Sequence, residues 1–320
     1  MDQDIHYLGK EFNLFVFYFS GKYKLLVPLE AWKLFWFLMR KPKQVYLCSF
    51  GGYHSFIVTL VAKLKACRSF IILNGTDSVA MPEFSYGHLR KGLLRWCCKK
   101  SYDWSDCLLP VSESLMDTIN QYAFTEKRLG LRAVFPDNEW KYEVIPNGFN
   151  PEFWRSETMM NPKSVLTVAT ASRIPHKGVD LILEVALLMK DYTFSVAGIE
   201  RLEDCPENVI CLGYLPLDEL RQEYGRHQFY LQLSVWEGFG CALCEAMLCG
   251  CIPIVSNVNM LPEIVLDEDV VLHERSAKKL QQLLKAVAMK SLKKNHFRSR
   301  IIERFHISRR IDDLRKVLFI

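Results

Sequence analysis

The sequence contains no apolar run close to the roughly eighteen residues that a helix needs to span a bilayer. Its first residues, Met-Asp-Gln-Asp-Ile-His, are acidic and lack the apolar segment of a secretory signal. Half of the 320 residues are hydrophobic and 12% are aromatic, which excludes a disordered chain. We therefore expect a globular cytoplasmic protein, soluble or peripheral on the inner face of the cell membrane. Its length suits two domains of about 150 residues.

The sequence also lacks a well-spaced set of metal ligands, although it has eleven cysteines. Cys241, Cys244, Cys249 and Cys251 superficially mimic a zinc site, but no second ligand pair lies in a Gly-rich knuckle. We expect most cysteines to be small core residues in a reducing compartment. No metal and no separate cofactor are expected.

The second half of the chain has no charge excess. Residues 149–320 hold 22 basic and 22 acidic residues, whereas residues 1–148 hold 19 basic and 14 acidic ones. Two segments of the first half, residues 32–43 and 88–100, mix cations with apolar side chains, as helices that cover a sheet or lie on an anionic membrane do. We expect the first to cover a sheet, because its apolar residues run all round the helix. The second is expected to contact the membrane. Nothing points to a nucleic-acid partner.

The most informative segment is residues 229–255. An apolar stretch leads through a turn with Gly238 and Gly240 into a short helix and another apolar stretch, which predicts strand, helix, strand. The glycines let the backbone approach a ligand, and the first amides of the helix suit a phosphate. Glu245, about one turn into the helix and eight positions after Glu237, can accept hydrogen bonds from paired hydroxyls. We predict a site that binds a phosphate and a polyol. The alternative is that Glu237 caps the helix and Glu245 lies on a solvated helix face.

A second strand-to-helix unit precedes this segment. Residues 164–171 are apolar and rich in β-formers, and the next loop holds Arg173 and Lys177. Two cations and a helix N-terminus would hold a diphosphate at this loop. The helix that follows has an apolar stripe, formed by Ile182, Val185, Ala186 and Met189.

These motifs, in this order, resemble the retaining glycosyltransferases of the GT-B fold, family 4 (glycosyl transferases group 1). The spacing of Glu237 and Glu245 is similar to the Glu-x7-Glu signature of that family. Residues 145–150 resemble the hinge that opens its C-terminal domain. Residues 209–214 resemble the strand and turn that lie beside the nucleotide base in relatives.

The resemblance implies an α/β protein of the GT-B fold, with two Rossmann-like domains facing across a cleft. We expect an acceptor-side domain at residues 1–148, a nucleotide-sugar-binding domain at 149–307 and a helix at 308–320 that crosses back to the first domain. The first domain looks shortened, because no strand and Gly-rich loop precede Phe12. Its pattern predicts a parallel sheet covered on both faces, with strands at 12–20, 44–50, 69–73 and 107–111 and helices at 27–40, 56–66 and 88–100.

The resemblance also implies metal-independent transfer of a sugar from a nucleotide diphosphosugar, most often UDP-linked. Arg173 and Lys177 would stabilise the leaving diphosphate, and Glu245 would hold the ribose. Glu237 would bind the sugar and favour the positive charge that develops at the anomeric carbon. The other donor-binding positions are Gly178, Gly213, Tyr214, Leu215, Gly238, Phe239, Gly240, Cys241, Ala242 and Leu243.

The acceptor side is expected to involve His54, Asn74, Asp77 and Ser112. Relatives often carry His-Gly-x-Asp where this chain has Asn74 to Asp77, and an asparagine cannot carry a proton. The expected acceptor is lipid-linked or a growing surface polysaccharide such as capsule or lipopolysaccharide. Two alternatives stay open: a GT-B isomerase or phosphorylase, and a non-catalytic nucleotide-binding subunit with a degenerate acceptor domain.

Overall fold

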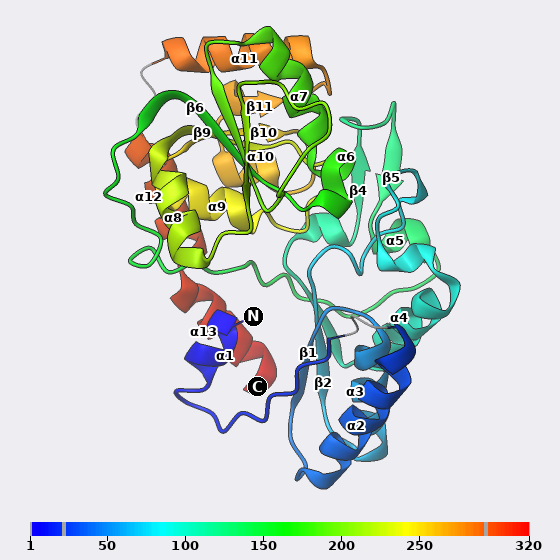
Figure 1. Ribbon diagram of the computed structural model, residues 1–320. Coiled ribbons are helices and arrows are strands. Elements are labelled where there is room, and N and C mark those ends of the chain that lie inside the picture. The colour runs from blue at the N-terminus through cyan, green and yellow to red at the C-terminus, as the bar shows by residue number, and fades with distance from the viewer. Residues whose placement is uncertain (1, 21–23, 291–293, 320) are drawn as a thin grey trace. The chain divides into compact units, whose positions relative to one another are not determined.

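The computed structural model describes residues 2–20, 24–290 and 294–319. The chain forms two compact α/β units (Figure 1). Unit 1 consists of Met1–Thr118, Arg128–Pro146 and Ser308–Ile320, and unit 2 of Ile119–Lys127 and Asn147–Ile307. The end of the chain therefore belongs to the first unit, and a short stretch of the first half belongs to the second.

Unit 1 contains a parallel sheet whose strands pair in sequence order: β1 (Tyr46–Ser49), β2 (Ser69–Leu73) and β3 (Cys107–Pro110). The strands predicted near 44–50, 69–73 and 107–111 are confirmed. Helix α3 packs between α2 and α4, as Figure 1 shows. The helices of this unit are α1 (Asp2–Leu8), α2 (Val27–Arg40), α3 (Tyr53–Leu64), α4 (Gly92–Trp104), α5 (Leu131–Val134) and α13 (Ile307–Phe319).

The prediction of a strand at residues 12–20 is wrong. This stretch pairs with no strand, although its composition favours one. Its aromatic side chains pack on α2 instead: the rings of Phe17 and Phe37 are 5.3 Å apart, and Lys41 Nζ lies 3.9 Å from the centre of the Phe15 ring. The helix predicted at 88–100 also starts later, because a 3-10 turn (His88–Arg90) precedes α4.

Unit 2 contains a parallel sheet in the order β11-β10-β9-β6-β7-β8. From β6 the chain adds β7 and β8 on one side, and then returns to add β9, β10 and β11 on the other. The chain thus changes direction between β6 and β9, where open α/β sheets bind ligands beyond the carboxyl ends of the strands. The strands are β6 (Asn161–Val168), β7 (Thr193–Ala197), β8 (Val209–Gly213), β9 (His227–Gln232), β10 (Ile252–Ser256) and β11 (Val271–Leu272).

The helices of unit 2 pack on this sheet in two groups: α7 contacts α11, whereas α8 and α12 contact α9. The predicted apolar stripe along α7 is buried; it consists of Ile182, Val185, Ala186 and Met189. The helices are α6 (Ile174–Lys177), α7 (Val179–Leu188), α8 (Leu217–Arg226), α9 (Cys241–Leu248), α10 (Leu261–Val265), α11 (Ala277–Met289) and α12 (Lys294–Phe305). Short elements complete the chain: 3-10 turns at Lys24–Leu26, Pro82–Phe84, Glu113–Leu115, Ala171–Arg173 and Glu268–Val270, and the paired strands β4 (Thr118–Asn120) and β5 (Lys127–Leu129).

A buried ion pair joins the two ends of the chain within unit 1. The Arg310 guanidinium on α13 donates to both carboxylate oxygens of Asp4 on α1, at 2.7 and 2.8 Å. It also donates to the carbonyl oxygens of Ile145 and Pro146 at 3.0 Å. Arg310 is only 5% exposed, so these contacts take the place of the water that would otherwise solvate its charge. The apolar stripe of α13 is buried beside it, at Ile311, Leu314 and Leu318.

We predict that Asp4→Ala lowers the free energy of unfolding by about 3–5 kcal/mol, because it leaves a buried guanidinium without a counter-charge. The double variant Asp4→Leu/Arg310→Met should recover most of this loss. Glu11→Ala is the matched control: it breaks the exposed Arg315–Glu11 pair, which is worth less than about 1 kcal/mol. Equal losses for Asp4→Ala and Glu11→Ala in urea unfolding would contradict the prediction.

Candidate active site

The loops that follow β6 and β9 meet through an ion pair. Lys177, at the end of α6, places Nζ 2.5 Å from Glu237 Oε2 in the turn after β9. The two side chains are 18% and 17% exposed. Gly178 makes this approach possible: its φ is +74°, and a Cβ there would lie 2.5 Å from the carbonyl oxygen of Leu233. The sheet thus brings together two residues that are 60 positions apart.

Neutral side chains hold the same carboxylate oxygen of Glu237. Gln232 Nε2 donates to it at 2.8 Å and Ser234 Oγ at 3.1 Å. The Tyr230 hydroxyl donates to Gln232 Oε1 at 2.9 Å, which turns the amide so that its Nε2 faces Glu237. All three supporting residues are at least 96% buried. Glu237 is therefore fixed in position by the end of strand β9 itself.

The charges around Glu237 decide its protonation. Burial alone raises the pKa of Glu237, but the Lys177 ammonium, its hydrogen bond and the donor from Ser234 outweigh burial and hold the pKa below its ordinary value. Beside the pair, burial and the nearby ammonium of Lys177 lower the pKa of His176 to about 3. At neutral pH the site therefore holds a carboxylate, an ammonium and a neutral imidazole.

The turn that carries Glu237 is also held from outside the sheet. Asn120, which is 2% exposed, donates from Nδ2 to the carbonyl oxygen of Val235 at 2.6 Å. The backbone N–H of Val235 donates to the carbonyl oxygen of His176 at 2.9 Å. The Glu237 N–H donates to Asn259 Oδ1 at 3.1 Å. Three separate segments of unit 2 thus fix one turn.

Glu245 lies in a different environment. It is half-buried on α9, and its nearest hydrogen-bond donor is the Tyr224 hydroxyl at 3.3 Å. Burial raises the pKa of Glu245 to about 8, and the Tyr224 hydroxyl offsets only part of this effect. Unlike Glu237, Glu245 is mostly protonated at neutral pH in the ligand-free protein.

Helix α9 begins at the turn predicted to bind a phosphate. Gly240 has a φ of +109°, and the first intrahelical bond runs from Cys244 N to the Gly240 carbonyl oxygen at 3.1 Å. The amides of Cys241, Ala242 and Leu243 therefore precede the hydrogen-bonded ladder of the helix. Cys241 is exposed and accepts a hydrogen bond from Asn147 at 3.3 Å.

The other predicted donor residues divide by exposure. Arg173, Tyr214 and Cys241 are exposed, and Leu215 and Ala242 are half-buried. Phe239 and Leu243 have side chains only 3% and 0% exposed, so they can serve a donor through their backbone alone. The Phe239 ring packs against those of Phe149 and Phe305. The remaining positions are buried glycines: Gly178, Gly213, Gly238 and Gly240.

The predicted acceptor residues all follow the carboxyl ends of strands in unit 1. His54 Nε2 lies 2.9 Å from the Ser49 carbonyl oxygen, and Asn74 Nδ2 donates to Ser49 Oγ at 3.3 Å. Burial lowers the pKa of His54. Asp77 is fully buried and accepts from the N–H groups of Gly51, Asn74 and Gly75, so its carboxylate joins two loops and is not presented to solvent. Ser112 is 1% exposed.

Sequence reasoning missed the residues that support the site. Tyr230 and Gln232 alternate along the end of β9, and Ser234 follows two positions after the strand ends; nothing in this pattern marks them as polar partners of Glu237. Asn120 is more than 110 positions from Val235. In unit 1, His88 Nδ1 lies 3.0 Å from the Gly51 carbonyl oxygen, which the basic character of its segment did not indicate.

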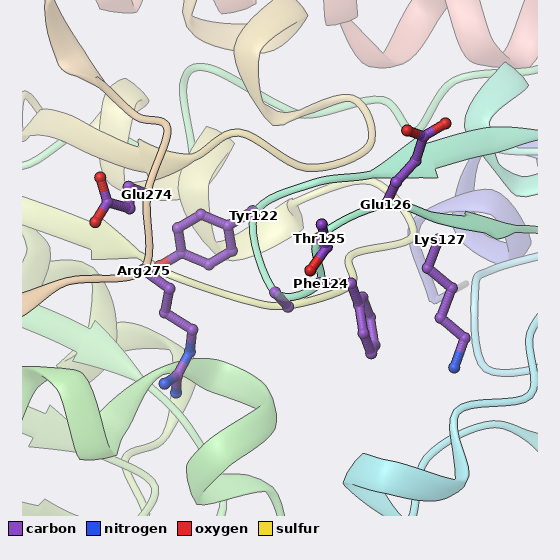
Figure 2. Close-up of a pocket in the computed structure, with 8 residues that line it drawn as sticks. Tyr122, Phe124, Thr125, Glu126, Lys127, Glu274 and Arg275 are labelled. Atoms are coloured by element: carbon purple, nitrogen blue, oxygen red, sulfur yellow. The ribbon is translucent and has the colours of Figure 1, made fainter.

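A hollow of about 710 Å³ lies elsewhere in unit 2 (Figure 2). None of the predicted donor residues lines it. Arg275 on its wall donates to both carboxylate oxygens of Asp180, at 2.7 and 2.6 Å, and so ties the hollow to the start of α7. Its lining carries charges of both signs: Tyr122, Ala123, Phe124, Thr125, Glu126, Lys127, Glu274 and Arg275.

The described part of the chain contains neither a cluster of metal ligands nor a helix that could span a membrane. Across residues 2–20, 24–290 and 294–319, no three His, Cys, Asp or Glu side chains gather as metal ligands. Seven cysteines are buried, as predicted, and Cys205 and Cys241 are exposed. Within the same described ranges, every helix is too short or too polar to cross a bilayer.

Comparisons with known proteins show similarity to transferases over part of the chain. The subunit gpi3 of phosphatidylinositol N-acetylglucosaminyltransferase from Schizosaccharomyces pombe is 30% identical over 150 residues, which cover 42% of this chain and 32% of that protein. The serotype-specific mannosyltransferase WbdA of Escherichia coli is 28% identical over 273 residues, covering 76% of this chain and 32% of WbdA. The chain thus spans about a third of the length of these curated relatives.

A solved structure gives the class of fold. Anabaena HepE, crystallised with UDP and glucose, has a TM-score of 0.69 at 14% identity, over 96% of this chain and 84% of HepE. The fold is that of the GT-B glycosyltransferases, so the predicted fold class is confirmed. Residues 151–304 match the family described as "Glycosyl transferases group 1". This matched segment, slightly less than half of the chain, contains both Glu237 and Glu245.

We predict that Lys177→Met reverses the pH dependence that Glu237 gives to stability. In the parent, the pKa of Glu237 lies below the ordinary 4.5, so the pair stabilises the fold above about pH 4.5 and its contribution is lost as pH falls through the lowered pKa. Without the ammonium, burial raises the pKa, and the free energy of unfolding should fall as pH rises from 4.5 to 7. We expect a loss of about 2–3 kcal/mol at pH 7.

Urea unfolding at several pH values measures this effect. The double variant Lys177→Met/Glu237→Gln should remove the new pH dependence. Lys163→Met is the surface control, because it breaks the exposed Lys163–Asp191 pair and should change little. An unchanged pH slope in Lys177→Met would mean that the ion pair does not set the charge of Glu237.

Proposed function

We propose that this protein is a retaining glycosyltransferase that moves a sugar from a nucleotide diphosphosugar, most simply UDP-linked, to an acceptor. The observation that carries the proposal is the ion pair of Lys177 and Glu237 at the ends of the central strands β6 and β9. It places a cation and a carboxylate side by side at the position where open α/β sheets bind ligands. The UDP bound to HepE supports the choice of nucleotide.

The roles of the residues follow from their charges. Lys177, exposed Arg173 and the first amides of α9 would stabilise the negative charge of the departing diphosphate. Glu237, kept ionised by Lys177, would bind sugar hydroxyls and favour the positive charge that grows at the anomeric carbon. Glu245 would accept hydrogen bonds from the ribose hydroxyls. No step in this scheme requires a metal ion.

We propose a lipid-linked or growing surface-polysaccharide acceptor. The name of gpi3 refers to a phosphatidylinositol acceptor and that of WbdA to serotype, and both support this class of substrate. His54 and Asn74 are the accessible residues with which unit 1 would meet it. We further propose a cytoplasmic location, peripheral on the inner face of the membrane.

The test is to incubate the full chain with UDP- and GDP-linked sugars, with and without membrane-lipid or oligosaccharide acceptors. We expect nucleotide release that depends on the acceptor and persists in a chelator. Arg173→Ala should weaken binding of the nucleoside diphosphate by about 1.5–3 kcal/mol, and it leaves the Lys177–Glu237 pair intact. Glu237→Gln should lower kcat more than affinity, because its partner charge develops in the transition state.

Other outcomes would contradict the proposal. Conversion of the donor without any acceptor would identify an isomerase or phosphorylase. Binding without turnover would identify a non-catalytic subunit, an outcome consistent with the buried carboxylate of Asp77. Full affinity in Arg173→Ala would remove that residue from the diphosphate site.

We also predict that nucleotide affinity rises with pH. Glu245 has a pKa of about 8 in the free protein, and its carboxylate form is needed to accept from two ribose hydroxyls. Binding must therefore release a proton, so affinity for UDP should increase about tenfold per pH unit from pH 6 and level off above about pH 8. Glu245→Gln should show only the titration of the nucleotide itself. Calorimetry with the same pH slope in both proteins would contradict this role for Glu245.

A further inference from the structure

Helix α2 has two apolar faces, and the structure covers only one of them. Leu34 and Leu38 are 3% and 5% exposed, on the face that packs toward α3. The opposite face exposes large apolar side chains three or four positions apart, which places them in one line along the helix. This line, the α2 stripe, consists of Leu29 (47% exposed), Trp32 (61%), Trp36 (44%) and Met39 (37%).

The exposed apolar surface extends beyond the helix. The preceding segment runs along α2, with Phe17 against Phe37, and leaves Leu14, Phe15 and Val16 about 40% exposed. Isolated apolar residues are normal on a protein surface, but contiguous exposed apolar patches mark binding surfaces. Two tryptophans in one such stripe are therefore expected to face a partner.

Cations surround the α2 stripe. Lys33, Arg40, Lys41 and Lys43 lie within eleven residues that contain no acid. A hollow of about 660 Å³ opens among these side chains, and its lining combines three aromatic and three cationic residues: Trp32, Lys33, Trp36, Phe37, Arg40 and Lys41. An apolar wall with a cationic rim matches a partner that is itself apolar inside and anionic at its surface.

We propose that α2 lies in the interface of a membrane that contains anionic lipid, with the α2 stripe at the boundary of the acyl chains and the cations among the headgroups. Tryptophan favours this depth because its ring is apolar and its N–H is polar. Lys33 and Arg40 can reach lipid phosphates beside it.

The structure favours α2 over residues 88–100 for this contact. Two of the five Lys and Arg residues in 88–100 already have partners within unit 1: Lys99 pairs with Asp103 at 3.0 Å, and Arg95 donates to the Val134 carbonyl oxygen at 2.9 Å. Residues 32–43 were predicted to cover a sheet, but α2 packs on α3, and it does so with one face only. This surface is separate from the proposed transfer chemistry, which rests on unit 2.

Co-sedimentation of the full chain with vesicles tests the proposal. The parent should bind vesicles of phosphatidylcholine with phosphatidylglycerol, and bind phosphatidylcholine alone much more weakly. Trp32→Ala/Trp36→Ala should weaken binding about tenfold or more. Trp32→Phe/Trp36→Phe should retain most of it, because the ring area is kept. Trp96→Ala on α4 is the matched control, since Trp96 is 48% exposed, and should bind as the parent does.

Thermal unfolding of each variant separates lost binding from lost folding. Lys33→Gln/Arg40→Gln, which should also weaken binding to the anionic vesicles, keeps the test valid if the Ala variant is unstable. The proposal is overturned if the parent does not sediment, or if the folded Ala variant sediments as the parent does. Loss of binding in Trp96→Ala but not in the α2 variants would transfer the contact to residues 88–100. A parent that is dimeric without lipid, and becomes monomeric in the α2 variant, would identify a second copy as the partner.

Discussion

The ion pair between Lys177 and Glu237 constrains everything else at the candidate site. It forms where the sheet of unit 2 changes direction, so the segments that follow the two central strands supply one partner each. A partly desolvated carboxylate is stable only with an opposite charge and several hydrogen-bond donors. Lys177, Gln232 and Ser234 meet this requirement, and Asn120 and Asn259 fix the turn that carries the carboxylate. The predicted diphosphate and sugar contacts are therefore electrostatically coupled.

The two glutamates of the signature show how environment separates chemically identical groups. Glu237 is near an ammonium, which holds its pKa below the ordinary value. Glu245 is eight residues away, but burial next to a neutral tyrosine raises its pKa to about 8. One site thus holds an ionised and a protonated carboxyl group at neutral pH. Paired groups with divergent pKa values commonly have different roles.

Each unit also depends on residues that are distant in sequence. In unit 1, an ion pair between Asp4 and Arg310 links the two ends of the chain. Unit 2 includes residues 119–127 from the first half of the chain. Local patterns cannot reveal such exchanges, because each segment satisfies its own apolar periodicity without its partner. The prediction of a strand at residues 12–20 was wrong for the same reason. The composition of this stretch favours a strand, but its aromatic rings pack on α2 and the stretch pairs with no strand.

By itself, the sequence predicted most of the elements and the resemblance to the group 1 glycosyltransferases. Apolar periodicity located β2, β8 and the stripe of α7, and the spacing of Glu237 and Glu245 in a strand-turn-helix segment identified a group 1 glycosyltransferase segment. Only the tertiary structure decided that Lys177 contacts Glu237, that Asp77 is buried among backbone amides, and that α2 leaves its tryptophans exposed. The physical reason is that periodicity records which side chains are apolar, whereas charge, protonation and exposure depend on distances set by strand order and packing.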